Sequence, residues 1–350
     1  MAAILVENLT KVYRTKVKSP GLAGSVKDIF APRHQDQLAV DGISFEVQPG
    51  EVMGFIGPNG AGKSTTIKIL AGILTPTSGR ASVLGLDPIR DRRRMLYQIG
   101  TVFGQKSQLW IHLPPLETFR LLGAIYDIDD RTLKGRIDEL VQAFEMTDIL
   151  ATPVRKLSLG QRMKCEIAAS LLHRPPVLFL DEPTIGLDVV IRKNIRDLVS
   201  GMNRSQGTTI ILTSHDTADI EKLCGRVIII NHGRVVFSDT VKNLKYNYLS
   251  RKVIGLKTEE KVDLDVPGLE VVKARDYTAK VEVDTSRYPL DKTIDALIAR
   301  NSVLDINVSD VPLEEVIAAI YKRTGREGDM KREMSKVKGE KVTDEVNGEP

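Results

Sequence analysis

The sequence predicts an α/β protein with a sheet flanked by helices, followed by a small α+β domain. Three observations support this prediction. Short β-branched runs alternate with helical patterns through about residue 245, a glycine-rich loop separates one such run from a helix, and the pattern changes to short strands near residue 250. A chain of 350 residues with 42% hydrophobic residues is long and apolar enough for two domains with buried cores.

The alternation defines a first domain over residues 1–245. Its candidate strands are Ile43–Val47, Val52–Ile56, Ile99–Phe103, Val177–Asp181, Thr208–Thr213 and Val227–Asn231. Helices are predicted to begin at Lys63, Leu116, Leu133 and Leu159 and near Val190. Residues 15–37, rich in Pro, Gly and basic side chains, are not assigned to an element, and a connection of that length is usually functional or mobile.

A second domain of the α+β type is predicted over residues 246–322. Its elements are strands Lys252–Leu256, Leu269–Ala274 and Lys280–Val283, a helix Leu290–Arg300, a strand Val303–Val308 and a helix Pro312–Tyr321. Residues 323–350 are mostly charged residues and glycine without periodic apolar positions, so we expect a disordered tail.

Composition excludes several functional classes. The longest apolar stretches are far shorter than the roughly 20 residues that span a bilayer, and the N-terminal apolar run ends at Glu7 without a basic lead or cleavage site. Two cysteines cannot form a four-thiolate zinc site and fit a reducing compartment. A net charge of +4 is too small for a nucleic-acid-binding face. We therefore expect a cytoplasmic protein without a nucleic-acid partner.

A phosphate-binding loop is the most specific local motif. Residues 57–65 fit the pattern G-x-x-x-x-G-K-[ST], directly after an apolar run and before a predicted helix. Backbone N–H groups of such a loop surround phosphates, the lysine reaches the outer phosphates, and the serine hydroxyl binds Mg²⁺. The predicted nucleotide-binding residues are Gly57, Pro58, Asn59, Gly60, Ala61, Gly62, Lys63, Ser64 and Thr65.

Two acidic residues end another apolar strand. In a nucleotide site, Asp181 would hold Mg²⁺ through water, and Glu182 would orient and polarise the attacking water. Without the phosphate loop, the pair would equally fit an ordinary solvated strand end. Because both motifs occur in one chain, we predict a Mg-nucleotide hydrolysis site.

Three further stretches carry a resemblance to a known family. They are Leu157–Gln161, with the sequence LSLGQ, Asp181–Asp188, with DEPTIGLD, and Thr213–Asp216, with TSHD. In this order and spacing, they make residues 2–245 resemble the ATP-binding cassette (ABC) ATPases, most of all the nucleotide-binding subunits of bacterial exporters with a separate membrane polypeptide. The resemblance implies a P-loop NTPase fold with a RecA-like core sheet, an antiparallel β subdomain and a helical subdomain at about 106–172.

The resemblance also implies roles for individual residues. Tyr13, just after the first strand, would stack on adenine, and Gln105 would sense Mg²⁺ and the attacking water. His215 would contact the γ-phosphate and help position Glu182, whereas Asp188 would link the two nucleotide sites of a dimer. With Lys63, the implied catalytic residues are Glu182, His215 and Gln105, and the implied metal-site residues are Ser64, Gln105 and Asp181.

One motif departs from the family pattern. In the family, Ser158, Gly160, Gln161 and nearby N–H groups bind the γ-phosphate of ATP held by the opposite subunit, but here Leu159 replaces a glycine. A backbone donor survives this change if the leucine side chain points away from the phosphate. Because one chain then lacks a complete site, the resemblance implies a homodimer, or a pair with a similar subunit, that encloses two ATP molecules.

The implied function is ATP hydrolysis that drives export through a separate membrane permease, on the inner face of the plasma membrane. Trp110 and its apolar neighbours would either dock that permease or be buried in the helical subdomain. Two alternatives stay open from the sequence: a soluble ABC-type ATPase acting on ribosomes or DNA, and a nucleotide-gated regulatory module. The transported substrate and the role of the second domain are not predicted.

Overall fold

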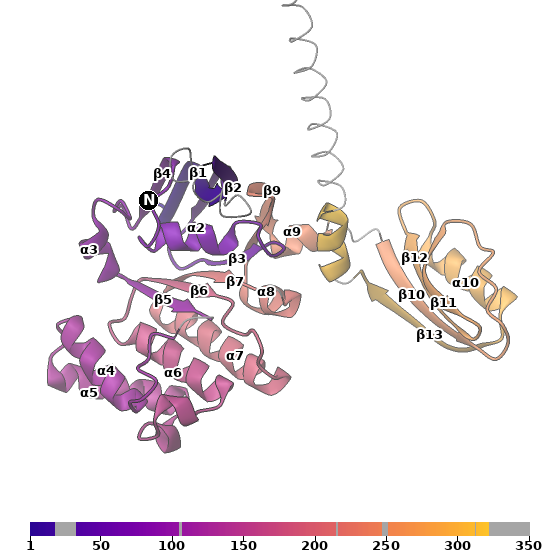
Figure 1. Ribbon diagram of the computed structural model, residues 1–350. Helices are drawn as coiled ribbons and strands as arrows, with labels where there is room; N and C mark the ends of the chain where they lie inside the picture. The colour runs from indigo at the N-terminus through magenta and orange to yellow at the C-terminus, as the bar shows by residue number, and fades with distance from the viewer. Residues whose placement is uncertain (18–32, 105–106, 215, 247–250, 312, 322–350) are drawn as a thin grey trace, which may run out of the picture. The chain divides into compact units, whose positions relative to one another are not determined.

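A computed structural model describes residues 1–17, 33–104, 107–214, 216–246, 251–311 and 313–321 (Figure 1). Gln105, His215 and the predicted disordered tail lie outside these residues. The chain divides into two compact units, Met1–Asp239 and Thr240–Pro350. No helix in the described ranges is long and apolar enough to cross a membrane. The predicted domain boundary near residue 245 stays a prediction.

The first unit is built on a central six-stranded sheet. Its strand order is β5-β6-β7-β3-β8-β9. The strands are β3 (Val52–Ile56), β5 (Ile99–Phe103), β6 (Val177–Asp181), β7 (Thr209–Thr213), β8 (Arg226–Asn231) and β9 (Arg234–Thr240). The pairs from β5 through β3 to β8 are parallel. Strands β3, β6 and β7 are buried at every position, as expected for parallel strands covered on both faces.

A three-stranded antiparallel sheet forms a second layer. Its order is β2-β1-β4, with β1 (Ile4–Val17), β2 (Arg33–Val47) and β4 (Ser78–Val83). Strands β1 and β2 pair from Ile4 with Val47 to Val17 with Arg33. They therefore extend into residues 15–37, which the sequence did not assign to an element.

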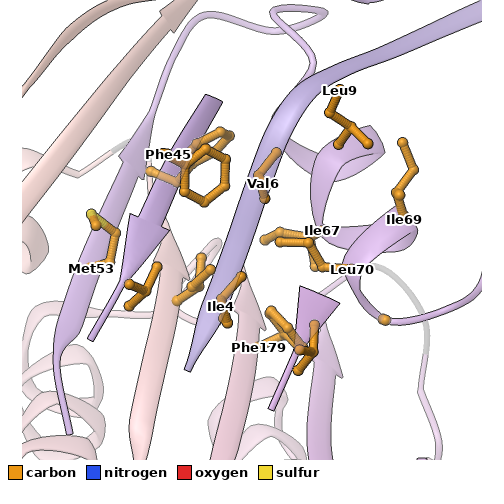
Figure 2. Packing of buried hydrophobic residues seen from close by; sticks show 14 of the residues in the cluster. Ile4, Val6, Leu9, Phe45, Met53, Ile67, Ile69, Leu70 and Phe179 are labelled. Carbon is orange, nitrogen blue, oxygen red and sulfur yellow. The ribbon is translucent and has the colours of Figure 1, made fainter. Parts of the chain in front are cut away.

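Helix α2 (Lys63–Leu70) joins the two sheets through one hydrophobic core. Figure 2 shows its Ile67 and Leu70 between Val6 and Ile4 of β1 and Phe179 of β6. Each fully buried side chain of this kind contributes about 1.5–3 kcal/mol. Because α2 begins directly after the glycine loop, this core fixes the position of that loop.

Helices complete the first unit. They are α3 (Arg92–Leu96), α4 (Pro115–Ile125), α5 (Asp130–Ala143), α6 (Leu159–Leu171), α7 (Val189–Gln206) and α8 (Thr217–Leu223), with short 3-10 helices η1 (Thr147–Ile149) and η2 (Val154–Lys156). Helix α5 starts three residues before the predicted Leu133, because Asp129 caps it by accepting a hydrogen bond from the Thr132 N–H.

The second unit holds a four-stranded antiparallel sheet of order β11-β12-β10-β13. Its elements are α9 (Val241–Tyr246), β10 (Arg251–Thr258), β11 (Leu269–Arg275), β12 (Thr278–Asp284), α10 (Leu290–Arg300) and β13 (Val303–Asp310), and residues 313–321 are helical. Leu297 of α10 packs with Ile254, Leu256, Val281 and Val283 in a separate core.

Candidate functional site

The glycine loop lies at the carboxyl end of β3, where sheet strands of this topology present binding residues. Gly60 and Gly62 have φ angles of 79° and 107°, which side-chain-bearing residues rarely adopt. A Cβ atom on Gly62 would lie 2.4 Å from the Ala39 carbonyl oxygen of β2. Pro58, Asn59 and Gly60 are exposed. The glycines therefore allow the tight loop that the sequence predicted.

Lys63 begins α2 with its ammonium group inside the loop. Its Nζ donates hydrogen bonds to the carbonyl oxygens of Gly57, at 2.6 Å, and of Pro58, at 3.3 Å. The side chain is buried. Burial lowers the pKa of Lys63, while the carboxylates of Glu182 and Asp181 act in the opposite direction. The lysine thus lies between the loop and the acidic strand end.

Asp181 lies at the carboxyl end of β6 and connects three elements. Its Oδ1 accepts hydrogen bonds from the Ser64 hydroxyl of α2, at 3.2 Å, and from the Thr213 hydroxyl of β7, at 2.7 Å. The two motifs predicted Mg²⁺-binding roles for both Ser64 and Asp181, and the structure brings the two side chains together. Thr213 belongs to the TSHD stretch, but the sequence predicts no role for it. Its contact with Asp181 joins residues 32 positions apart.

Glu182 follows β6 with a left-handed backbone, at a φ angle of 56°. Its N–H donates to the Thr213 hydroxyl at 2.9 Å and to the Thr213 carbonyl at 3.2 Å, so β7 holds this conformation. Gly104 donates its N–H to the Asp181 carbonyl, and a Cβ on Gly104 would lie 2.6 Å from the Glu182 carbonyl oxygen. The residue before Gln105 therefore lies against the acidic pair.

A buried polar network supports the same strand ends. Asp219 of α8 is fully buried, and its Oδ1 accepts a hydrogen bond from Nη1 of the buried Arg196 of α7, at 2.7 Å. Its Oδ2 accepts from the hydroxyls of Thr184, at 2.5 Å, and Ser214, at 3.0 Å. This network joins the segment after Glu182 to the segment that leads to residue 215. Sequence reasoning missed it.

A second ion pair lies beyond residue 215. Arg192 of α7 pairs with Asp216 and also donates from Nε to the Leu187 carbonyl at 2.8 Å. The Asp216 N–H donates to the Ser214 hydroxyl at 3.0 Å. Helix α7 therefore holds the described residues on both sides of residue 215.

The LSLGQ segment starts α6. The Ser158 hydroxyl accepts a hydrogen bond from the Gln161 N–H at 3.2 Å, and the Gln161 side chain accepts from the Ser158 N–H at 2.9 Å. This reciprocal pair is a capping box. Gly160 is buried, and a Cβ there would lie 2.5 Å from Ile191 of α7. The side chains of Ser158 and Gln161 thus each accept a hydrogen bond from the other residue's backbone N–H at the start of the helix.

Leu159 is 39% exposed, and its Cδ2 lies 3.2 Å from the position that a Cβ would take on Gly186. Its side chain therefore rests on the loop that leads to α7. Asp188 caps α7 by accepting a hydrogen bond from the Ile191 N–H at 2.9 Å. The starts of α6 and α7 consequently lie against each other, which brings the segments of Ser158 and Asp188 together.

Tyr13 lies within β1, paired with Gln37 of β2, so the expectation that it follows the first strand was wrong. The Lys11 ammonium lies 5.3 Å from the centre of its ring. In the described ranges, no hydrogen bond links Tyr13 or Ser158 to the loop of residues 57–65. Gln105 and His215, both predicted to be catalytic, lie outside the residues that the structure describes.

Comparisons with known proteins decide the family. Residues 40–185 match the ABC transporter family. The chain is 32% identical over 236 residues to the ABC transporter ATP-binding protein NatA of Bacillus subtilis (strain 168), an alignment that covers 65% of this chain and 96% of that protein. The chain belongs to the ATP-binding proteins of ABC transporters.

Other relatives agree with this assignment. The daunorubicin resistance ATP-binding protein DrrA2 of Streptomyces coeruleorubidus is 35% identical to this chain over 256 residues, an alignment that covers 72% of this chain and 77% of that protein. A solved ATP-binding subunit of an ABC transporter covers 70% of this chain and 93% of its own, with 24% identity and a TM-score of 0.58. A dimeric ATP-binding cassette bound to ADP and Pi aligns with 68% of this chain and 98% of its own chain, with 24% identity and a TM-score of 0.57.

These findings confirm the predicted family and fold class, a P-loop ABC ATPase with an antiparallel β sheet beside the central sheet. The chain is an ATP-binding and ATP-hydrolysing subunit of an ABC transporter. Relatives such as NatA are named as ABC transporter proteins, and no comparison favours the ribosome-acting, DNA-acting or regulatory alternatives.

Proposed function

We propose that this ABC protein couples Mg-ATP hydrolysis at the described strand ends to export through a separate permease. The observation that carries the proposal is the convergence of Lys63, Ser64, Asp181 and Glu182 at the carboxyl ends of β3 and β6. Phosphoryl transfer depends mainly on positioning and on stabilising charge, and these are the groups that it needs.

The loop and Lys63 bind the phosphates. Backbone N–H groups of residues 57–65, except Pro58, would surround the phosphates, and ATP would replace the loop carbonyls as the partner of the Lys63 ammonium. Ser64 and Asp181 offer two oxygens that already lie 3.2 Å apart, a donor set that suits Mg²⁺ with phosphate and water as its other ligands. When bound, Mg²⁺ neutralises charge on the phosphates.

The Glu182 carboxylate orients and polarises the attacking water in this proposal, and the hydrogen bonds of its backbone N–H to Thr213 fix the residue directly after Asp181. Gln105 and His215 would act with it: Gln105 would contact Mg²⁺ and the water, and His215 would contact the γ-phosphate. The supporting observations are the positions of their neighbours, Gly104 against Asp181 and Glu182, and Ser214 and Asp216 tied to α7 and α8. Tyr13 stacks on adenine.

ATP binding closes two copies of the chain. In this proposal Ser158, Gly160 and Gln161 of one subunit contact the γ-phosphate held by the other, and Asp188 links the two sites. The start of α6 has the positive potential that favours an anion. The Leu159 side chain packs against Gly186. This position supports the proposal that the side chain points away from the phosphate while the backbone N–H of residue 159 can still donate a hydrogen bond.

A membrane permease at the inner face of the plasma membrane couples to the opening and closing of the two ATP-binding subunits. Trp110, Ile111 and Leu113 are exposed apolar residues just after the Gln105 loop, and they form the docking surface in this proposal. Export as the direction is supported by the daunorubicin resistance proteins among the relatives. We assign ATP hydrolysis to residues 1–245 and treat residues 246–322 as an additional domain.

The proposal is tested by purifying the tagged chain from its native membranes in mild detergent. We expect a multi-spanning protein in stoichiometric amount and ATP turnover in the eluate that is lost in Glu182→Gln. Exposed Glu145→Gln is the matched control and should keep turnover. Ribosomal, DNA-bound or only soluble partners would contradict the transport part of the proposal.

A further inference from the structure

A buried carboxylate on α6 has no part in the phosphate chemistry. Glu166 is buried in the middle of this helix. Burial raises the pKa of its carboxyl group, and hydrogen bonds from the segment after Gln105 oppose that shift. A buried carboxylate with neutral donors is costly to maintain, so the contacts that it makes have to be specific.

Both carboxylate oxygens of Glu166 bind the same short segment. The Ser107 hydroxyl donates to Oε1, and the Gln108 N–H donates to Oε2 at 3.1 Å. The Gln108 side-chain amide donates in addition to the Glu166 backbone carbonyl at 2.8 Å. Ser107 accepts the Leu109 N–H at 3.1 Å, which closes the turn. The segment 107–109 is therefore fastened to the middle of α6.

The chain continues from this turn into the exposed apolar surface and is fastened a second time. The Ile111 carbonyl accepts the Arg155 N–H at 2.9 Å, and the Leu113 carbonyl accepts the Val154 N–H at 3.1 Å. Val154 and Arg155 belong to η2, which ends two residues before Ser158. Residues 107–113 are thus bound on both sides of the Ser158 capping box.

We propose that Glu166 is a positioning residue that clamps segment 107–113 to α6, so that a partner on Trp110, Ile111 and Leu113 moves the start of α6 with it. The clamp itself rests on the contacts above. Its effect on ATP turnover rests on the proposed role of Ser158, and the permease is the partner of the proposed function. Each part is tested by a separate readout.

Trp110 reports on the clamp directly, because it is the sole tryptophan of the chain. Acrylamide quenching of its fluorescence is measured in the full chain for wild type, Glu166→Ala, Glu166→Gln and Ser107→Ala. We expect the quenching constant to rise at least twofold in Glu166→Ala and by a smaller factor in the two milder variants. Glu139→Ala is the matched control, since it removes an exposed carboxylate of α5 that pairs with Arg174.

A quenching constant within about 20% of wild type in all three folded variants would overturn the clamp. An equal rise in Glu139→Ala would also overturn it, because the effect would then be general loosening. If Glu166→Ala does not fold, the decision falls to Ser107→Ala and Glu166→Gln.

ATP turnover, measured without the permease, tests whether the clamp affects the position of α6. We expect Glu166→Ala and Ser107→Ala to keep the KM for ATP within about twofold and to lower kcat at least fivefold, because loop binding of ATP is intact while α6 is mispositioned. An unchanged kcat beside increased quenching would contradict transmission to α6 and leave the clamp in place. Absence of ATP turnover in wild type would instead contradict the hydrolysis assignment, with quenching still deciding the clamp.

Discussion

Lys63 is a buried ammonium ion whose hydrogen bonds end on carbonyl oxygens of its own loop. Carbonyl partners satisfy donors but supply no formal negative charge, and burial lowers the lysine pKa. ATP phosphates supply that charge. The Asp181 and Glu182 carboxylates oppose the pKa shift, but the hydrogen bonds of the ammonium group go to neutral carbonyls. A bound nucleotide therefore replaces neutral acceptors with charged phosphate oxygens, which make stronger hydrogen bonds.

Removing this ammonium group should weaken ATP binding. We expect Lys63→Ala to lower ATP affinity at least tenfold, about 1.4 kcal/mol, and to reduce turnover at least a hundredfold, because charge on the transferring phosphate loses its partner. Titration with a fluorescent ATP analogue and phosphate release measure the two effects. Lys68→Ala, in the same helix, is the control and should bind as wild type. Unchanged affinity in Lys63→Ala would contradict the role of the loop.

The Arg196–Asp219 pair should matter far more for stability than an exposed pair. Arg196→Met leaves a buried carboxylate with only two hydroxyl partners, so the free energy of unfolding should fall by about 3–5 kcal/mol. Arg174→Ala, which breaks the exposed pair with Glu139, should cost at most about 1 kcal/mol. Urea unfolding of both variants makes the comparison. Similar losses in the two variants would show that burial of the network contributes little.

At the scale of elements, the starts of α6 and α7 interlock through small residues. Ile191 of α7 covers Gly160, and Leu159 covers Gly186. Since both helix starts are capped by their own side chains, Ser158 and Asp188, their first N–H groups are held in fixed directions. Leu159 therefore works as a packing residue in a motif where the family has glycine.

Replacing Leu159 by the family glycine tests this interpretation. We expect Leu159→Gly to lose about 1 kcal/mol of stability, from lost packing and the entropy of glycine, and to keep kcat within about threefold because backbone donors are unchanged. Thermal unfolding and phosphate release measure the two quantities. A tenfold loss or gain in kcat would show that the leucine side chain itself enters the reaction.

His173, just after α6, links the helices to β5 and should make stability pH-dependent. Its ring stacks on Tyr126 at 3.9 Å and bonds the Ile99 carbonyl through Nε2 at 2.9 Å, while Nδ1 has no hydrogen-bond partner in the described residues. Burial lowers the pKa of His173 from 6.5 to about 4.

The direction of this pH dependence follows from the difference in proton uptake between the folded and the unfolded chain. Above pH 6.5 the ring is neutral in both states and has no effect, whereas between pH 6.5 and about 4 the unfolded chain takes up a proton that the folded chain does not. Stability should therefore fall across this window, by about 1–3 kcal/mol after allowance for partial exposure. Urea unfolding at pH 7 and pH 5 should show the loss in wild type and a smaller loss in His173→Gln. Equal losses would remove His173 as the cause.

Most elements were predictable because their signals are local. Strands β3, β5 and β6 and helix α10 occur with the predicted bounds, since each is a compact apolar run or a periodic helix between clear breaks. Strand β4 was not predicted: its sequence, SGRASV, lacks β-branched alternation, and it forms because Val83 and its neighbours pair with β1. Tyr13 was misplaced for the related reason that pairing with β2 lengthens β1.

The candidate site also contains residues that local sequence signals predict and contacts that they do not. Motif residues of the loop and the acidic strand carry their own sequence signal, and the structure brings Ser64, Lys63 and Asp181 together. The contacts that support the site carry no such sequence signal. Glu166 contacts Ser107, 59 positions away in the sequence, and Arg196 contacts Asp219, 23 positions away. Such pairs depend on how helices pack on the sheet, and neither residue type predicts its partner.

At the level of the whole molecule, we propose that one ABC subunit completes its nucleotide site only with a second copy of the chain. The phosphate loop and acidic pair occupy one set of strand ends, and the Ser158 segment occupies the start of α6 without a described hydrogen bond to them. In the proposed closed dimer, the Ser158 segment of one subunit meets the phosphate site of the other. The second unit has its own sheet and core, so it can be altered without removing residues of the site.

The Glu182→Gln variant separates ATP-driven dimerisation from ATP hydrolysis. Mass in solution is measured by light scattering with and without Mg-ATP, alongside phosphate release, with exposed Glu145→Gln as control. We expect the variant to bind ATP, to double its mass with Mg-ATP and to turn over at most about 1% as fast as wild type, since the water loses the carboxylate that polarises it while the binding groups remain. Turnover near the wild-type rate in Glu182→Gln would contradict this expectation.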